Sequence, residues 1–217
     1  TGRDPWEFAS TGTRPDKTLP VATVLTLAAS GSETSNSCVL TNEETKEKRG
    51  ITSETNRPVI SFLNPENTFT VSKFQTGCGI VDIMMHTLER YLTPEGGESD
   101  LTDRIAEGLL IAVRDAGRRA IADPRDYEAR ATLMWAGSVS HNDYTGCGRK
   151  RLFPVHKLEH ELSAFRDEIA HGAGLSVLFP AWAEHEMPYD YPRFAQFANR
   201  VLGVEMDFEH PERTARE

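Results

Sequence analysis

Short apolar runs separated by turn-forming residues occupy the first 65 residues of the chain. Runs of ~4–8 β-branched and apolar residues, bounded by Gly, Pro, Asn or Ser, are typical of strands. A polar turn at residues 42–45 separates two of these runs, as it would in a hairpin. We expect the run before Asn64 and Pro65 to form a buried strand. The predicted strands span residues 21–27, 38–41, 48–51 and 58–63.

Beyond Pro65 the apolar positions recur with the period of about 3.6 residues that is typical of helices. The predicted helices span residues 71–92, 101–121, 127–141, 171–186 and 191–202. An apolar stripe on the first of them consists of Ile80, Ile83, Met84, Thr87 and Leu88. The change of period predicts a piece of an α/β domain over residues 1–65, followed by an all-helical domain over residues 66–217.

Composition and charge favour a folded protein of one large or two small domains. The chain has 217 residues, of which 38% are hydrophobic and 26% are charged. These values are typical of globular rather than disordered proteins. The formal net charge is -9, from 33 acidic against 24 basic residues. Because nucleic-acid binders usually carry a basic excess, nucleic acid is not an expected partner.

The sequence also indicates the cellular compartment in which the protein is located. No apolar run approaches the ~20 residues of a membrane helix, so no membrane association is expected. The cysteines Cys38, Cys78 and Cys147 are odd in number and form no CxxC pair, which argues against a disulfide framework. A reducing, cytoplasmic location is therefore expected. The sequence opens without Met, in a loop-like segment, and we expect it to be part of a longer chain.

Asp82 and His86 are the first candidate site residues. They lie four positions apart in an apolar helical segment, so they share one helix face. That spacing can present a carboxylate oxygen and an imidazole nitrogen to one cation. A pair on the helix surface is the alternative, but uncompensated polar groups in an apolar segment cost ~1–3 kcal/mol.

A second group of candidates consists of His156, His160 and His171. His156 and His160 share a helix face, and His171 opens the next apolar helix after a polar turn. A single histidine of this kind would more often be a core or surface residue. Together with Asp82 and His86, the group can supply one aspartate and three histidines, a shell that suits Fe²⁺ or Zn²⁺.

Several segments resemble a known family. Residues 64–89 and 156–180 resemble the two signatures of the iron-containing (group III) alcohol dehydrogenases. Residues 25–33 look like the family's cofactor-facing strand end, and residues 42–48 resemble the hairpin of its butanol dehydrogenase branch. The resemblance implies a dehydroquinate synthase-like fold, with a nucleotide-binding α/β domain followed by an all-helical metal domain.

The resemblance also implies roles for single residues. His160 matches a histidine that lies near the substrate without binding the metal, as a candidate proton relay. Packing beside the ligands is the alternative for this residue. The implied metal ligands are Asp82, His86, His156 and His171. The implied dinucleotide-binding residues are Thr26, Ser30, Lys48 and Thr70. A solvated hairpin charge is the alternative for Lys48, and ordinary turn chemistry is the alternative for Thr26 and Ser30.

The implied function is hydride transfer between a small alcohol or aldehyde and NAD or NADP, in a homodimer, with a divalent metal, Fe²⁺ or Zn²⁺. A metal-dependent hydrolase is one alternative, because such a site with bound water could also serve hydrolysis. It would have no need of the segment from Thr26 to Glu33. A metal-binding fragment without turnover is another alternative.

Three features depart from the family pattern. Asn64 stands where the first signature has an acid, and His156 and His171 lie 15 positions apart, one more than the family spacing. The Gly-Gly-Gly-Ser phosphate loop of the family does not occur, so we expect little turnover from this chain alone. We expect the extra residue to bulge within residues 165–169, leaving His171 at the metal. The alternative is that Asp167 or Glu168 replaces it as a ligand.

Overall fold

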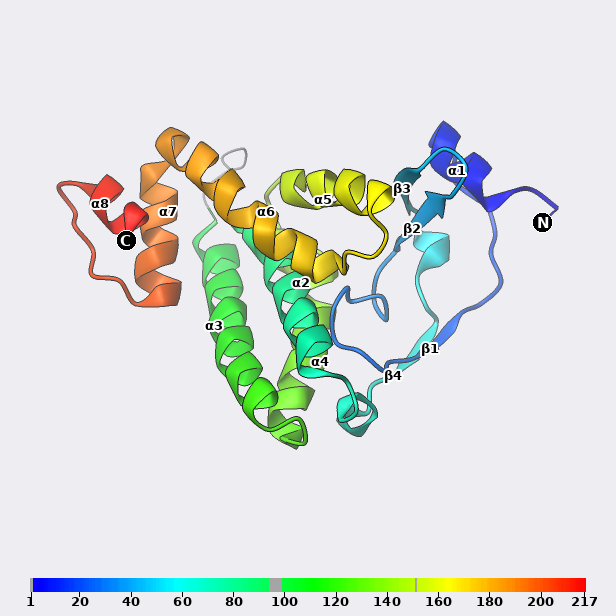
Figure 1. The fold of residues 1–217 in the computed structure, drawn as a ribbon, viewed down its shortest axis with the longest axis horizontal. Coiled ribbons are helices and arrows are strands. Elements are labelled where there is room, and N and C mark those ends of the chain that lie inside the picture. Colours follow the sequence, from blue (N-terminus) through cyan, green and yellow to red (C-terminus); the bar gives the residue numbers. More distant parts are fainter. Residues whose placement is uncertain (1, 94–98, 151) are drawn as a thin grey trace.

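The computed structural model describes residues 2–93, 99–150 and 152–217, with the strands preceding most of the helices (Figure 1). The strands are β1 (Ala22–Val24), β2 (Ser37–Asn42), β3 (Glu47–Thr52) and β4 (Ile60–Phe62). The α-helices are α1 (Pro5–Thr11), α2 (Lys73–Tyr91), α3 (Asp100–Ala122), α4 (Tyr127–His141), α5 (Pro154–Phe165), α6 (His171–Glu186), α7 (Tyr191–Phe197) and α8 (Pro211–Arg216). Short 3-10 turns lie at Glu54–Asn56, Pro65–Thr68, Tyr144–Gly146 and Met187–Tyr189.

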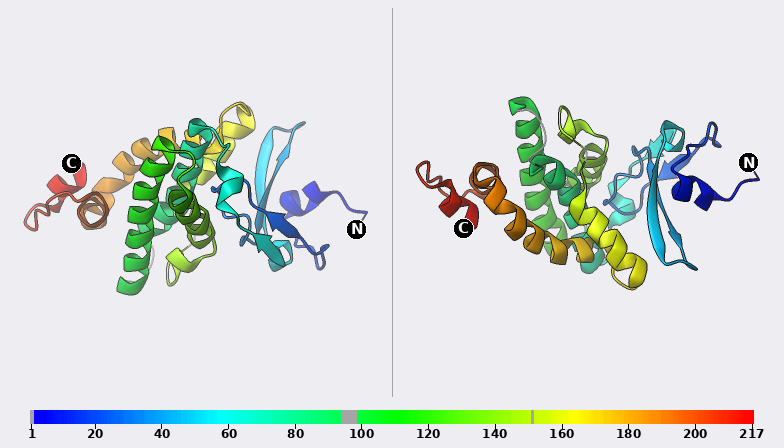
Figure 2. Two further views of the ribbon diagram at one scale, coloured as in Figure 1. Left: turned by 90° about the horizontal axis from the view of Figure 1, so that it is seen from below. Right: turned by 90° about the horizontal axis from the view of Figure 1, so that it is seen from above.

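The predicted hairpin is confirmed. β2 and β3 pair antiparallel, with Asn42 opposite Glu47. The Asn42 side chain accepts hydrogen bonds from the backbone N–H groups of Glu44 and Thr45, at 2.9 and 3.1 Å, the local turn chemistry for which Asn is favoured. The hairpin stands beside α1 and reaches across to α5 (Figure 2).

The other two predicted strands form a parallel pair, in which Val24 of β1 lies opposite Phe62 of β4. Both are shorter than predicted, and the expectation that residues 58–63 are buried is wrong. Val59 is 71% exposed, and Ile60 and Phe62 are about half exposed. Within the described ranges, β1 and β4 pair only with each other, so this small sheet leaves much of its apolar surface in solvent.

The five predicted helices are confirmed to within about two residues. Polar side chains cap several of their first turns, which satisfies backbone N–H groups that have no partner within the helix. Ser72 accepts from Gln75 N at the start of α2, and Asp126 accepts from Ala129 N at the start of α4. The last predicted helix, residues 191–202, is α-helical in α7 and continues as a π-helical turn, Ala198–Leu202. The sequence patterns did not predict α1 or α8.

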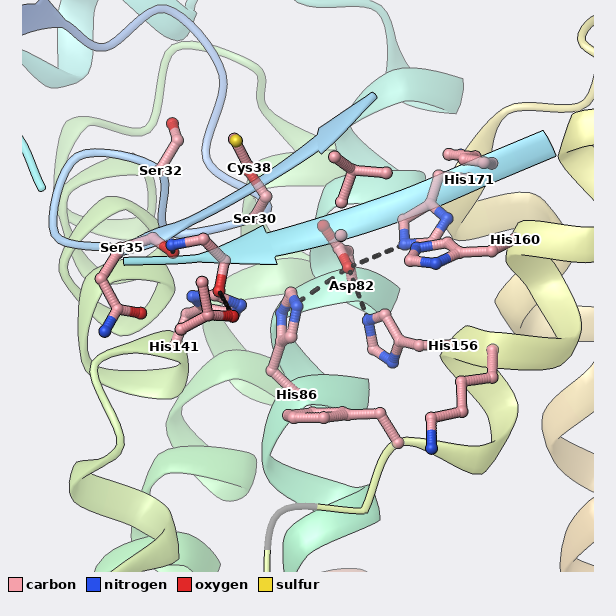
Figure 3. A pocket seen from close by; sticks show the side chains of 18 of the residues that line it. Ser30, Ser32, Ser35, Cys38, Asp82, His86, His141, His156, His160 and His171 are labelled. Carbon is pink, nitrogen blue, oxygen red and sulfur yellow. Dashed lines mark hydrogen bonds and ion pairs between the residues drawn. The ribbon is translucent and has the colours of Figure 1, made fainter. Parts of the chain in front are cut away.

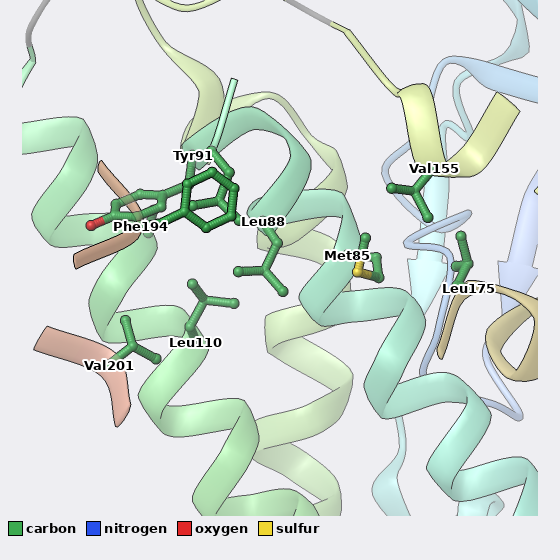
Figure 4. Packing of buried hydrophobic residues seen from close by; sticks show 10 residues of the cluster. Met85, Leu88, Tyr91, Leu110, Val155, Leu175, Phe194 and Val201 are labelled. Carbon is green, nitrogen blue, oxygen red and sulfur yellow. The ribbon is translucent and has the colours of Figure 1, made fainter. Parts of the chain in front are cut away.

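α2 is the central helix, with α3, α4 and α6 packed around it (Figure 1). Its predicted apolar stripe is confirmed, because Ile83 and Leu88 are buried and the other members lie at least partly in the core. One face contributes to a cluster with Leu110 of α3 and Leu175 of α6 (Figure 4). α2 therefore has a fixed position from which its polar residues can build a site.

Two glycines allow close approaches to α2. A Cβ on Gly172, near the start of α6, would overlap the backbone carbonyl of Cys78 in α2. A Cβ on Gly79 would overlap the carbonyl of Ala28, in the loop after β1. The first approach brings His171 next to α2, and the second holds the N-terminal region against the helices.

A buried ionic network joins α3 to the later helices. Asp103 accepts hydrogen bonds from Arg149, which precedes α5, and from Arg193 of α7, the latter at 2.6 Å. Glu107, one turn further along α3, accepts a hydrogen bond of 2.8 Å from the Tyr91 hydroxyl. Because the charges are paired, the network can be buried without leaving isolated ions.

Candidate metal centre

Four side chains from three helices meet around one carboxylate oxygen (Figure 3). We call them the ligand set: Asp82 and His86 of α2, His156 of α5 and His171, the first residue of α6. The distance from Asp82 Oδ1 is 3.6 Å to His86 Nδ1, 3.4 Å to His156 Nε2 and 3.7 Å to His171 Nε2. The structure thus brings together all four residues that the sequence predicted as ligands.

These distances fit a metal ion better than hydrogen bonds. Charge-assisted hydrogen bonds are usually about 2.7–2.9 Å long. Metal–nitrogen and metal–oxygen bonds of about 2.0–2.1 Å in a tetrahedron place the ligand atoms about 3.3 Å apart. Three buried atoms, Asp82 Oδ1, His86 Nδ1 and His156 Nε2, also have no hydrogen-bond partner. A divalent cation would satisfy all of them.

Two buried carboxylates hold the outer sides of the histidine rings. Nδ1 of His156 bonds to Glu89 of α2, and Nδ1 of His171 bonds to Glu159 of α5. Each bond leaves Nε2 of the ring facing Asp82. Histidine ligands commonly use the second ring nitrogen in this way. No sequence pattern indicates a role for either acid, although both lie in the segments that carry the predicted ligands.

The ligand set has the charge distribution of a cation site. Burial raises the pKa of the Asp82 carboxyl, but the neighbouring His86 and His156 outweigh burial and lower it below its usual range. Burial lowers the pKa of His86 well below its ordinary value. Burial also lowers the pKa of His156, but Asp82 and Glu89 outweigh it and raise the pKa to about 9. Near neutral pH an ionised carboxylate therefore lies beside a neutral His86 and a protonated His156, and a divalent cation would replace the proton of His156 on binding.

The ligand set opens onto a pocket of about 710 Å³. His160, the predicted relay, is half-buried in its lining, with its ring centre 5.5 Å from that of His171. Burial, and then the charge of Lys48, lower the pKa of His160 to about 4. His160 is therefore neutral near pH 7. Hydroxyl and amide groups from the segment before β2 also line the pocket, namely Ser30, Ser32, Ser35 and Asn36.

His141 also lines this pocket, although no sequence pattern indicates it. It is the last residue of α4, and its ring meets that of His86 edge to face, with centres 4.3 Å apart. Burial lowers its pKa to about 4. Its sequence position at the end of a helix carries no signal of this contact, which depends on how α4 packs against α2.

The four predicted dinucleotide-binding residues are dispersed. Thr26 and Ser30 line a smaller cavity of about 450 Å³ beside the end of β1, and Ser30 also lines the larger pocket. Lys48 lies in the larger pocket and donates a hydrogen bond of 2.8 Å to the Ser163 hydroxyl. Thr70 is exposed in a turn and lines neither cavity. Their roles in cofactor binding stay predictions.

The segment between α5 and α6 lies outside both helices, as residues 166–170. Asp167 and Glu168 are exposed there, and Glu168 accepts a hydrogen bond from Arg166 at 2.5 Å. His171, and neither acid, lies beside Asp82. The arrangement agrees with the expected bulge, while ligation by His171 stays a prediction. All three cysteines are free, as expected.

Comparison with known proteins identifies the family. A model of the C-terminal region of the Fe-containing alcohol dehydrogenase family matches residues 76–217, more than half of the chain, and an iron-containing alcohol dehydrogenase model matches residues 1–65. The chain belongs to the iron-containing alcohol dehydrogenase family. The family predicted from the sequence motifs is thereby confirmed. The division into domains at residue 65 stays a prediction.

Curated relatives within the iron-containing alcohol dehydrogenase family include NADH-dependent butanol dehydrogenase A of Clostridium acetobutylicum. It is 41% identical over 203 residues, which are 93% of this chain and 52% of that protein. NADPH-dependent aldehyde reductase YqhD of Escherichia coli is 33% identical over 93% of this chain and 52% of its own length. The chain therefore spans about half the length of these relatives.

A solved structure gives the same fold. The crystal structure of NADH-dependent butanol dehydrogenase A from Thermotoga maritima matches with a TM-score of 0.93 and 36% identity, over 100% of this chain and 54% of that one. The predicted fold class, an α/β piece followed by an all-helical metal-binding region, is confirmed. No helix in the described ranges is long and apolar enough to cross a membrane.

Proposed function

We propose that this chain carries the metal centre of an NAD(P)-dependent alcohol dehydrogenase or aldehyde reductase. The proposal rests on the ligand set, whose four side chains meet beside a pocket that extends to the loop after β1. The names of the relatives, an NADH-dependent butanol dehydrogenase and an NADPH-dependent aldehyde reductase, support the same class of reaction. Small alcohols and aldehydes are the proposed substrates.

The ligand set would hold one Fe²⁺ or Zn²⁺ ion, and its mixed oxygen and nitrogen donors suit either metal. When bound, such an ion acts as a Lewis acid that polarises an alcohol or carbonyl oxygen. Apolar side chains in the pocket lining, such as Val39 and Phe153, would help to exclude water from the hydride that is transferred. In alcohol oxidation, hydride would move from the substrate carbon to the oxidised nicotinamide and the proton would leave the substrate oxygen. Reduction of an aldehyde would reverse both transfers.

His160 would accept that proton from the substrate oxygen or donate it back. Its imidazole is neutral near pH 7 and faces the pocket beside His171, so one ring nitrogen can accept a proton and the other can donate one. Packing against the His171 ring, without proton transfer, is the simpler role for the same position.

The dinucleotide would lie along the strand ends and the pocket wall. Thr26 and Ser30 would contact it at the end of β1, Lys48 would contact it from the hairpin, and Thr70 would contact it from the turn before α2. Ser30 supports this arrangement best, because it lines both cavities. A nucleotide there would bring its nicotinamide towards the ligand set.

Binding to the metal-loaded chain tests the proposal, because the chain spans about half the length of its relatives. Cobalt(II) can replace Zn²⁺ and has a visible spectrum that reports its ligands. We expect a titration to end at about one equivalent per chain, the count that a four-ligand site implies. Butanol or butyraldehyde should then shift the cobalt bands, and NADH fluorescence should rise on mixing. Absence of both responses in a cobalt-loaded chain would contradict the proposal.

A metal-dependent hydrolase would behave differently. It would cleave an activated ester or phosphoester with the metal bound and would leave NADH fluorescence unchanged. The same samples, with His86→Ala as a control that should lack cobalt, separate the two functions. Sedimentation of the same samples tests the homodimer that we propose.

A further inference from the structure

Glu159 is a fully buried carboxylate that the proposed reaction does not use. It lies on α5, between His156 and His160, and one of its oxygens bonds to Nδ1 of His171. Its other oxygen is buried without a hydrogen-bond partner. Burying a carboxylate is costly unless it is paired, so this position requires a physical reason.

The neighbouring helix α6 leaves space for the Glu159 side chain. A Cβ on Gly174, one turn into α6, would come within 2.8 Å of Glu159 Cγ. The glycine therefore leaves room for the acid beside His171. A larger residue at position 174 would push the carboxylate away from the imidazole.

Lys48 supplies a positive charge from the hairpin. Its Nζ lies 3.9 Å from Glu159 Oε2 and donates a hydrogen bond of 2.8 Å to the Ser163 hydroxyl. The side chain of Lys48 is 19% exposed, so water screens this charge only partly. β3 thus contributes directly to the charge balance around α5 and α6.

Glu89 bonds to His156 as Glu159 bonds to His171, but Glu89 also accepts hydrogen bonds from the backbone at the start of α5. Its Oε1 accepts the backbone N–H groups of Val155 and His156 at 2.5 and 3.2 Å, at the start of a helix whose own N-cap residue makes no side-chain bond. Replacing Glu89 would therefore disturb α5 itself. Glu159 makes no such cap, which makes it the cleaner residue to test.

We propose that Glu159 is a positioning residue, which holds His171 with Nδ1 protonated and Nε2 directed at the metal, and that Lys48 of the hairpin balances its charge. This inference rests on the proposed metal-binding function. The imidazole of His171 is 30% exposed, so without Glu159 it would be free to turn or to move its proton to Nε2. Either change removes the lone pair that a metal requires.

The test compares two nearly isosteric variants of the full chain. Glu159→Met removes the hydrogen-bond acceptor, whereas Glu159→Gln can keep a carbonyl oxygen at Nδ1. Competition with a chelator should show that Zn²⁺ binds about 10–100-fold more weakly to Glu159→Met, the usual effect of losing such an outer carboxylate. Glu159→Gln should lose less than about tenfold. Glu161→Gln, an exposed position on the same helix, is the matched control and should bind Zn²⁺ like the wild type.

Nitrogen NMR of the imidazoles gives a second readout that does not depend on the variants folding. In the zinc-free wild-type chain, His171 should carry its proton on Nδ1. A proton on Nε2, or Zn²⁺ affinity unchanged in a folded Glu159→Met, would overturn the inference. If the wild type binds no metal at all, the proposed function fails instead, and the two failures are therefore distinguishable.

A double-mutant cycle tests the role of Lys48. Lys48→Met should lower the urea midpoint in the wild-type background, because it leaves the buried Glu159 charge without its counter-charge. The same change should have a smaller effect in the Glu159→Met background, where only the hydrogen bond of Lys48 to Ser163 is lost. Equal shifts in the two backgrounds would contradict the pairing of Lys48 with Glu159.

Discussion

Apolar side chains are buried in the helical region but largely exposed in the β1–β4 pair. Leu110 and Val113 of α3 are fully buried, whereas Val24 of β1 is 63% exposed and Phe62 of β4 is 55% exposed. Apolar burial contributes roughly 25 cal/mol per Å², so most of the stabilising surface lies among the helices.

The same contrast holds for charge. The helical region buries carboxylates and guanidinium groups, such as Asp103 and Arg149, and pairs them. The charged residues of the hairpin, such as Glu47 and Arg49, pair near the surface, where such pairs contribute little. The helices therefore form a rigid frame around the ligand set, against which the N-terminal region packs through contacts such as that of Gly79.

The largest expected effect is loss of metal from the helical frame. His86→Ala should reduce bound Zn²⁺ from about one equivalent per chain to near zero, because it removes a ligand from a four-ligand site. Elemental analysis after dialysis measures this. His185→Ala, at an exposed position of α6, should retain the metal. Metal content like that of the wild type in His86→Ala would show that the ligand set is assigned incorrectly.

The ionic network should make the stability of the helical region depend on pH. Asp103→Asn leaves Arg149 and Arg193 without their carboxylate, and breaking a buried pair costs about 3–5 kcal/mol. Burial raises the pKa of Asp103, but Arg193 and Arg149 outweigh it, so the folded pKa is lowered. The stability that the ionised Asp103 contributes is therefore fully present above pH 3.8, the ordinary pKa of aspartate. It is lost as the pH falls through the lowered pKa of Asp103 in the folded chain.

Urea unfolding of the wild type and Asp103→Asn at several pH values measures this difference. The two curves should be well separated near pH 7 and should approach each other in acid. A separation that stays constant down to the acid limit would argue against an ionised Asp103 as its source.

Truncation of one apolar residue in each region compares the two directly. Leu110→Ala should cost about 2–5 kcal/mol of unfolding free energy, because it opens a cavity in the core. Phe62→Ala should cost less than about 1 kcal/mol, because half of that ring is in solvent. Chemical denaturation of both variants measures the loss of unfolding free energy in each. Equal losses would contradict the difference between the two regions.

The smallest expected effect concerns one exposed glycine of the helical frame. Gly108 lies in α3, where an added Cβ would meet nothing within 4 Å. Gly108→Ala should therefore stabilise the chain by about 0.5–1 kcal/mol, since alanine favours a helix more than glycine does. Gly172→Ala is the opposing control, because its Cβ would overlap the Cys78 carbonyl. Thermal unfolding should move up for the first variant and down for the second, and a shift in the same direction for both would contradict the packing.

Local sequence patterns were sufficient to predict the elements that depend on the spacing of neighbouring residues. The period of about 3.6 residues located the long helices, and the four-residue spacing of Asp82 and His86 placed two candidate ligands on one helix face. The polar turn at Asn42 defined the hairpin for the same reason, because turn chemistry depends on neighbouring residues. The family was recognisable because its motifs are continuous stretches of sequence.

Contacts between distant segments depend on how the chain folds and could not be predicted from local patterns. The pairing of Glu89 with His156 joins residues 67 positions apart, and the contact of Lys48 with Ser163 joins residues 115 positions apart. The position of His141 against His86 depends on how α4 packs on α2. The exposure of β4 was likewise not predictable, since an apolar run is the same in sequence whether or not another layer covers it. Local periodicity specifies a helix or strand and its apolar face, but which side chains share a site depends on how those elements pack.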